Sequence, residues 1–87
     1  MSTENSFKSA AEAVKNLARR PSNDHLLQLY ALYKQGTEGD VSGKRPGMLD
    51  MKGRAKYDSW AGLKGMSGDE AQKKYVQLVQ ELQTTYG

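Results

Sequence analysis

Apolar residues recur at three- and four-residue spacing in the N-terminal part of this chain, which is the spacing of one helix face. The first stretch covers about residues 6–18 and is broken by Pro21. A second stretch begins after Ser22, whose hydroxyl can accept a free backbone N–H, and is expected to fade near Gly36. The apolar positions are Phe7, Ala10, Ala11, Val14 and Leu17, and then Leu26, Leu29, Tyr30 and Tyr33. Each stretch is a predicted helix.

Two further helices are predicted in the C-terminal half. Asp50 can cap a shorter helix over about residues 51–64, which Gly65 would end. Ser67 and Glu70 have the S-x-x-E spacing of a capping box, which predicts a helix over about residues 68–85. The sequence shows no alternating strand pattern. The predicted fold is therefore all-α, with four helices in a single domain spanning residues 1–87.

A long loop is predicted between the second and third helices, over about residues 36–50. Glycines punctuate it, and Pro46-Gly47 suits the two central positions of a type II turn, in which glycine supplies a positive φ. Irregular segments of this length in small domains are usually functional or disordered. Because Met48-Leu49 offers an apolar anchor, we expect the loop to be ordered.

The composition argues against several classes of protein. A chain of 87 residues has a small core, and without cysteine it can form no disulfide, thiolate nucleophile or cysteine-type zinc site. His25 is the single histidine, and no serine lies in a nucleophile-elbow motif. We therefore predict no catalytic residues, no metal site and no cofactor. The N-terminus lacks the pattern of a signal peptide, and no apolar run is long enough for a membrane span, so a cytoplasmic protein is expected.

The net charge of +3 is a mild bias that suits an anionic partner without identifying it. Tyr30, Tyr33 and Lys34 share one helix face, where two rings beside a cation could bind a base and a phosphate. An ordinary half-buried helix face has the same spacing. Three classes remain open from the residues alone: a binder of an amphipathic anion, a small helical nucleic-acid-binding module, and a protein-interaction bundle.

Three segments taken together resemble the acyl-CoA-binding protein family. The segments are Leu29-Tyr30-Ala31-Leu32-Tyr33-Lys34-Gln35 followed by Gly39-Asp40, then Arg45-Pro46-Gly47-Met48-Leu49-Asp50, and then Lys56-Tyr57-Asp58-Ser59-Trp60 followed by Leu63-Lys64-Gly65. The resemblance covers nearly the whole chain, including the closing Glu81-Leu82 and Tyr86-Gly87. It implies a four-helix bundle with up-down-down-up topology, in which the long loop between helices 2 and 3 is an overhand connection.

The resemblance also implies a function and a set of site residues. The expected protein is a non-catalytic, monomeric carrier that binds medium- to long-chain fatty acyl-CoA and makes transient contacts with enzymes or membranes, with no nucleic-acid partner. The implied head-group residues are Tyr30, Lys34 and Lys56 at the 3′-phosphate, Tyr33 at the adenine, Ala31 and Leu32 in the same segment, and Lys15 from the first helix. Tyr75 is implied at the pantetheine and acyl region, and Ala11, Leu26 and Leu27 along the acyl groove.

Two positions depart from the usual pattern of the family. Tyr57 stands where tryptophan is common, and its hydroxyl requires a hydrogen-bond partner. Gly36 stands where alanine is common, which is expected to loosen the end of the second helix. Neither change falls on an implied phosphate ligand.

Overall fold

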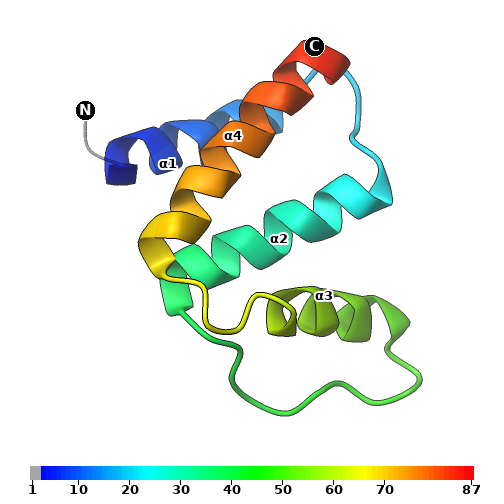
Figure 1. Ribbon diagram of the computed structural model, residues 1–87. Coiled ribbons are helices and arrows are strands. Elements are labelled where there is room, and N and C mark those ends of the chain that lie inside the picture. The colour runs from blue at the N-terminus through cyan, green and yellow to red at the C-terminus, as the bar shows by residue number, and fades with distance from the viewer. Residues whose placement is uncertain (1–2) are drawn as a thin grey trace.

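The computed structural model describes residues 3–87, with side chains described from residue 5 onward. Its elements are α1 (Thr3–Ala13), the 3-10 helix η1 (Val14–Asn16), α2 (Asn23–Glu38), α3 (Met51–Ala61) and α4 (Gly68–Tyr86). These residues form no strand, so the predicted all-α fold is confirmed. In Figure 1, α2 and α3 run in one direction while α1 and α4 run in the other, which confirms the up-down-down-up topology.

Side-chain caps begin the helices where the sequence predicted them. Ser22 Oγ accepts the His25 N–H at the start of α2, at a donor–acceptor distance of 3.3 Å. Asp50 does the same for α3 through the Gly53 N–H, and Ser67 caps α4 through the Glu70 N–H. Each cap satisfies one of the backbone donors that a helix start leaves without an intrahelical partner.

The predicted end of α2 near Gly36 was wrong, because the helix continues to Glu38. Gly36 lies against α4: a Cβ atom placed on it would lie 2.9 Å from Gln72 Cγ. Gln72 Nε2 in turn donates a hydrogen bond to the Gly36 carbonyl at 2.9 Å. The missing side chain therefore allows a close approach between helices, and this contact outweighs the low helix propensity of glycine.

Two other predicted helix ends were wrong in the opposite direction, because the helices end earlier than expected. The first helix was expected to reach Ala18, but α1 ends at Ala13 and narrows into η1. The third was expected to reach Lys64, but α3 ends at Ala61 and hydrogen-bonded turns follow it. Gly65, with a φ of +94°, comes after those turns. Local 3-10 and turn geometry at helix ends is common and is poorly marked in the sequence.

The loop between α2 and α3 differs from its prediction at two points. Gly47 has no positive φ, so the expected type II turn at Pro46-Gly47 is wrong. The turn lies further on, where the Asp50 N–H donates to the Gly47 carbonyl at 3.0 Å. Met48 and Leu49 occupy its centre and are 80% and 101% exposed, so they do not anchor the loop as predicted.

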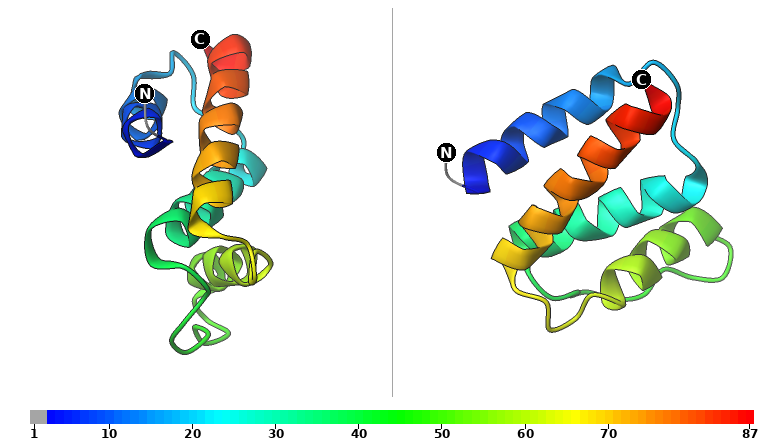
Figure 2. Two further views of the ribbon diagram at one scale, coloured as in Figure 1. Left: turned by 60° about the vertical axis from the view of Figure 1, so that its left-hand side comes forward. Right: turned by 45° about the horizontal axis from the view of Figure 1, so that its top comes forward.

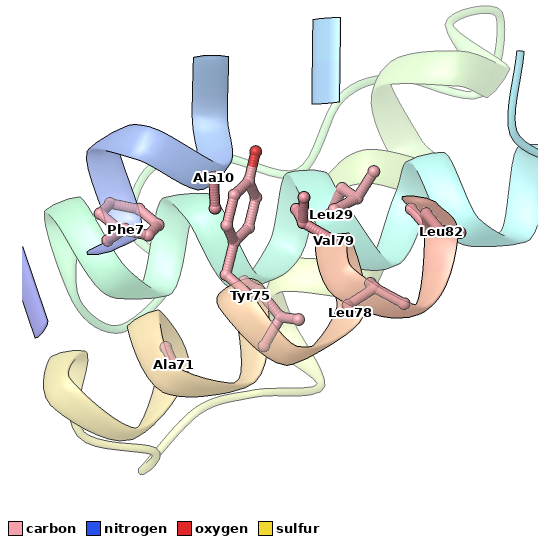
Figure 3. Close-up of a cluster of buried hydrophobic side chains, with 9 residues drawn as sticks. Phe7, Ala10, Leu29, Ala71, Tyr75, Leu78, Val79 and Leu82 are labelled. Carbon is pink, nitrogen blue, oxygen red and sulfur yellow. The ribbon is translucent and has the colours of Figure 1, made fainter. Parts of the chain in front are cut away.

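The main hydrophobic core is built by α1, α2 and α4. Figure 3 shows side chains of these three helices converging, with Tyr75 of α4 extending toward Ala10 of α1. The members of this core are Phe7, Ala10, Leu29, Leu32, Ala71, Tyr75, Leu78, Val79 and Leu82. Helix α3 lies beside α2 at the edge of the molecule (Figure 2), and Trp60 is its one buried side chain. Helix α3 is therefore attached to a core to which it contributes little.

The buried side-chain amide of Gln35 joins the end of α2 to the loop that follows it and to the segment between α3 and α4. Gln35 is 0% exposed, and its Nε2 donates to Asp40 Oδ1 at 2.9 Å and to the Met66 carbonyl at 2.8 Å. Asp40 Oδ1 also accepts the Gly65 N–H at 2.8 Å. The hydrogen bond from Gly65, and to a smaller extent the one from Gln35, holds the pKa of the Asp40 carboxyl below its ordinary value.

We predict that Asp40→Asn destabilises the protein more at neutral pH than in acid. The lowered pKa means that ionised Asp40 contributes stability above the ordinary aspartate pKa of about 3.9, and that this contribution disappears as pH falls through the folded value. Urea unfolding at pH 7 and below about pH 3 measures the difference. Glu81→Gln, which removes an exposed carboxylate from α4, is the control. An equal loss for Asp40→Asn at both pH values would contradict the prediction.

Candidate functional site

Two cation–π contacts cross the seam between α2 and α3. Lys34 of α2 places its Nζ 4.9 Å from the ring centroid of Trp60 on α3. Lys56 of α3 places its Nζ 5.4 Å from the ring centroid of Tyr30 on α2. Each helix thus supplies one cation and one ring, and such contacts are attractive within about 6 Å. Three predicted head-group residues, Tyr30, Lys34 and Lys56, are brought together at this seam.

A groove of about 470 Å³ lies between the first turns of α2 and α3. Leu26, Leu27, Met51 and Ala55 supply its apolar lining, and Lys56 lies along it as well. The remaining lining residues are Arg20, Asn23 and Lys52. Two predicted acyl-groove residues, Leu26 and Leu27, therefore line an open groove that also holds Lys56. An apolar lining with three basic side chains suits a ligand with a hydrocarbon part and an anionic part.

The second predicted tyrosine of α2 faces α1 and α4. The Tyr33 ring centroid lies 5.4 Å from that of Phe7 and 6.0 Å from that of Tyr75. Tyr33 is 43% exposed, whereas Tyr75 is buried, and burial raises the pKa of the Tyr75 hydroxyl, with Tyr33 adding to the effect. The exposed part of Tyr33 is available for stacking, while Tyr75 also belongs to the core.

Ala31 and Leu32 lie on another side of α2 from Tyr30. Both are buried, and both line a second groove of about 520 Å³ that extends along Ser59, Leu63 and Met66. The other residues of this second groove are Asp24, Leu27, Gln28 and Lys74. The five-residue segment from Tyr30 to Lys34 is therefore divided among several sides of the helix, as helical geometry requires of adjacent residues.

The remaining sequence-predicted residues lie away from the seam. Lys15 lies in η1, its side chain is 70% exposed, and its Nζ is 3.5 Å from Glu12 Oε1. Within residues 5–87, no contact joins Lys15 to Tyr30, Lys34 or Lys56. Ala11 packs against the main core. The same region brings no three His, Asp or Glu side chains close enough to hold a metal ion, and no helix of residues 3–87 is long and apolar enough to span a bilayer.

One of the two lysines at the seam, Lys34, is paired with an acidic residue of its own helix. Glu38 forms an ion pair with Lys34, one helical turn along α2. This hydrogen bond is the main cause of the raised pKa of Lys34, and partial burial of the ammonium opposes it. Lys34 is therefore firmly cationic, but its charge is shared with Glu38 in this structure. Glu38 was not among the residues that sequence analysis selected.

Polar contacts attach the loop between α2 and α3 to α3. Arg45 donates two hydrogen bonds to Asp58, from Nε at 2.9 Å and from an Nη at 2.7 Å. This pairing lowers the pKa of Asp58 and raises that of Arg45. Tyr57, which requires a partner for its hydroxyl, donates to the Gly43 carbonyl at 3.1 Å. Trp60 Nε1 donates to the Gly39 carbonyl at 2.8 Å, so three residues of α3 hold the loop.

Three groove residues of α3, Met51, Lys52 and Ala55, were missed by the sequence analysis, which gave a ligand role only to Lys56 of this helix. Met51, Lys52, Ala55 and Lys56 are spaced so that they share one face of a helix, and all four line the groove. The four-residue spacing of Met51 from Ala55, and of Lys52 from Lys56, was visible in the sequence. What the spacing could not tell is that this face lies toward α2.

The comparisons with known proteins agree with this architecture. Residues 4–79 match the sequence model of the family described as "Acyl CoA binding protein". The chain belongs to the acyl-CoA-binding protein family. "Acyl-CoA-binding protein homolog 1" of Caenorhabditis elegans is 56% identical over 82 residues, which are 94% of this chain and 95% of that protein. "Acyl-CoA-binding protein homolog" of Drosophila melanogaster is 49% identical over 80 residues, 92% of this chain and 93% of that protein.

Solved structures of the family share the fold. The crystal structure of Oryza sativa acyl-CoA-binding protein 2 superposes with a TM-score of 0.92 at 38% identity, covering 95% of this chain and 90% of that chain. The solution structure of the acyl-coenzyme A binding protein from yeast gives a TM-score of 0.74 at 48% identity, covering 92% of this chain and 93% of that chain. The four-helix arrangement that positions the α2–α3 seam is thus that of this family.

We predict that Arg45→Lys loosens the loop without unfolding the protein. Lysine keeps the charge but cannot donate two parallel hydrogen bonds to Asp58. Because the pair is about half exposed and screened by solvent, the free energy of unfolding should fall only slightly. Amide hydrogen exchange over residues 41–49 should become faster, while that of α4 stays unchanged. Unaltered exchange in the loop would refute the role assigned to this pair.

Proposed function

We propose that this chain is a cytoplasmic, non-catalytic carrier that binds one medium- to long-chain fatty acyl-CoA molecule. The observation that carries the proposal is the α2–α3 seam, where an open groove with an apolar lining lies beside cations from both helices. A fatty acyl-CoA has the matching chemistry, with a hydrocarbon chain at one end and phosphates at the other. Membership of the acyl-CoA-binding protein family supports the same ligand.

The proposed roles follow the two parts of the ligand. Lys34, Lys56 and Tyr30 bind the 3′-phosphate, because charge-assisted hydrogen bonds from ammonium and phenol groups suit phosphate oxygens. The exposed part of Tyr33 stacks on the adenine. Leu26 and Leu27 contact the acyl chain in the groove. The remaining roles are those that the family resemblance implies. The head group is also contacted by Lys15, Ala31 and Leu32. The pantetheine and acyl region is contacted by Tyr75, and the acyl chain by Ala11.

An energy estimate shows why both parts of the ligand are needed. Burying the roughly fourteen methylenes of a C16 chain supplies about 11 kcal/mol at about 0.8 kcal/mol each. Nanomolar binding requires a net binding free energy of about 12 kcal/mol. Restricting the motion of the acyl chain and of the whole ligand costs several kcal/mol, which must be supplied in addition. The tail alone therefore falls short, and phosphate contacts and stacking supply the remainder. The tail in turn adds apolar contacts to α3, which buries only Trp60 by itself.

We predict that palmitoyl-CoA binds at least about a hundredfold more tightly than palmitate or CoA, since each fragment provides only one of the two sets of contacts.

Lys56→Ala should weaken palmitoyl-CoA binding by more than about tenfold, because a charge-assisted phosphate contact is lost. Isothermal titration calorimetry below the micelle-forming concentration measures both effects.

Lys73→Ala is the matched control, because it also removes one exposed lysine, but from α4 and outside the groove lining. The proposal fails if palmitoyl-CoA produces no heat. It also fails if the control weakens binding as much as Lys56→Ala does. Oligonucleotide binding that collapses with salt, in place of acyl-CoA binding, would favour a nucleic-acid-binding module instead.

We further predict that Glu38→Gln strengthens palmitoyl-CoA binding. Lys34 pairs with Glu38, so a phosphate must displace that carboxylate and then lie near its charge. A half-exposed ion pair of this kind contributes up to about 1 kcal/mol, which sets the expected gain at up to about fivefold. The gain should shrink at high salt, because screening weakens both the pair and the repulsion. An unchanged or weaker affinity at low salt would contradict this account.

A further inference from the structure

The loop before α3 exposes an unusual amount of apolar surface at its tip. Met48, Leu49 and Met51 are 80%, 101% and 78% exposed, and they fall within four consecutive residues. We name residues 48–51 the loop tip. Its third residue, Asp50, uses its carboxylate to cap α3 by accepting the Gly53 N–H. Three largely exposed apolar side chains at the junction of the loop and α3 are not explained by the stability of the fold.

The segment around this tip carries an excess of basic residues. Residues 44–58 hold five basic and two acidic residues, a net charge of +3. The whole chain also has a net charge of +3, so the remaining residues, with eight basic and eight acidic side chains, are neutral. Of the two acidic residues, Asp50 caps a helix and Asp58 is paired with Arg45. The apolar tip is thus surrounded in sequence by a segment with a positive excess of three charges.

The tip is also continuous with the proposed acyl groove. Met51 belongs to both, and Lys52 and Lys56 of the same helix line the groove. Figure 1 shows that the first turn of α3 and the first turn of α2, between which the groove lies, are at the same end of the molecule as the end of the loop. A surface that contacted the tip would therefore lie next to the opening of the groove.

We propose that the loop tip docks this protein on the surface of a lipid bilayer that contains anionic lipids. Exposed Met and Leu side chains can enter the boundary between headgroups and acyl chains, while nearby Lys and Arg side chains are attracted to anionic headgroups. A stable protein interface buries about 800 Å² on each partner, far more than a four-residue turn provides, so a second copy or another protein fits this surface poorly.

Docking in this way deepens the proposed function on which it rests, because it places the groove against the membrane from which an acyl chain would enter or leave. The tip brings the apolar wall formed by Met51, Leu26 and Leu27 next to the hydrocarbon region. An acyl chain could then pass between bilayer and groove with little exposure to water. Docking itself requires no bound acyl-CoA, so the two proposals can be tested separately.

The test is flotation of the ligand-free protein with phosphatidylcholine vesicles prepared with and without phosphatidylserine. Wild type should float with the anionic vesicles, much less with the neutral ones, and less as salt rises. The double variant Met48→Ser/Leu49→Ser should weaken anionic vesicle binding by about tenfold or more, because the inserted apolar area is lost. It should leave the helical circular dichroism and the palmitoyl-CoA affinity in solution unchanged, since these two side chains are exposed and lie outside the groove lining.

A pair of charge variants separates position from net charge. Lys52→Gln and Lys73→Gln lower the net charge equally, but only Lys52 follows the tip directly. Lys52→Gln should weaken anionic vesicle binding by about fivefold, and Lys73→Gln by much less.

Four results would overturn the docking proposal: no flotation at low salt, equal flotation of wild type and the double variant, equal losses for the two charge variants, or a dimer in sedimentation that the double variant abolishes while vesicles do not bind. Vesicle binding without palmitoyl-CoA binding would instead overturn the carrier function and leave the docking surface standing.

Discussion

The position of α3 depends on one side chain, Trp60. It is the one buried residue of that helix, its ring lies under the Lys34 ammonium, and its indole N–H donates to the Gly39 carbonyl of the loop. The other attachments of α3 to α2 and the loop are polar or cation–π contacts at partly exposed positions, through Lys56, Tyr57 and Asp58. A helix held in this way can lie beside α2 without closing the space between them.

This constraint explains where the candidate site lies. The core formed by α1, α2 and α4 does not need α3 to fill it, so the α2–α3 seam can remain open at little cost to stability. The cations that hold the seam together, Lys34 and Lys56, are also the groups best placed to bind phosphate. Binding would therefore exchange contacts within the seam for contacts with the ligand, with Glu38 released from Lys34.

Helix starts that are set by a capping side chain were predicted well. The caps of Ser22, Asp50 and Ser67 depend on residues only three positions away, and all three are confirmed. Features that depend on distant residues were missed. The end of α2 was misplaced because Gly36 meets Gln72 of α4. The anchoring role expected of Met48-Leu49 was wrong because both side chains are exposed.

The sequence by itself determined the helical class, the starts of α2, α3 and α4, and the family, since hydrophobic periodicity, capping residues and the order of three motifs are all encoded locally or along the chain. The start of α1 was placed near residue 6, but this helix begins at Thr3. It also contained the residue types of the candidate site. Only the tertiary structure decided how they are distributed: Tyr30 with Lys56 at the seam, Ala31 and Leu32 along a second groove, and Lys15 away from both. The reason is that a helix presents all of its faces, and which face meets which neighbour is decided by packing between residues far apart in the chain.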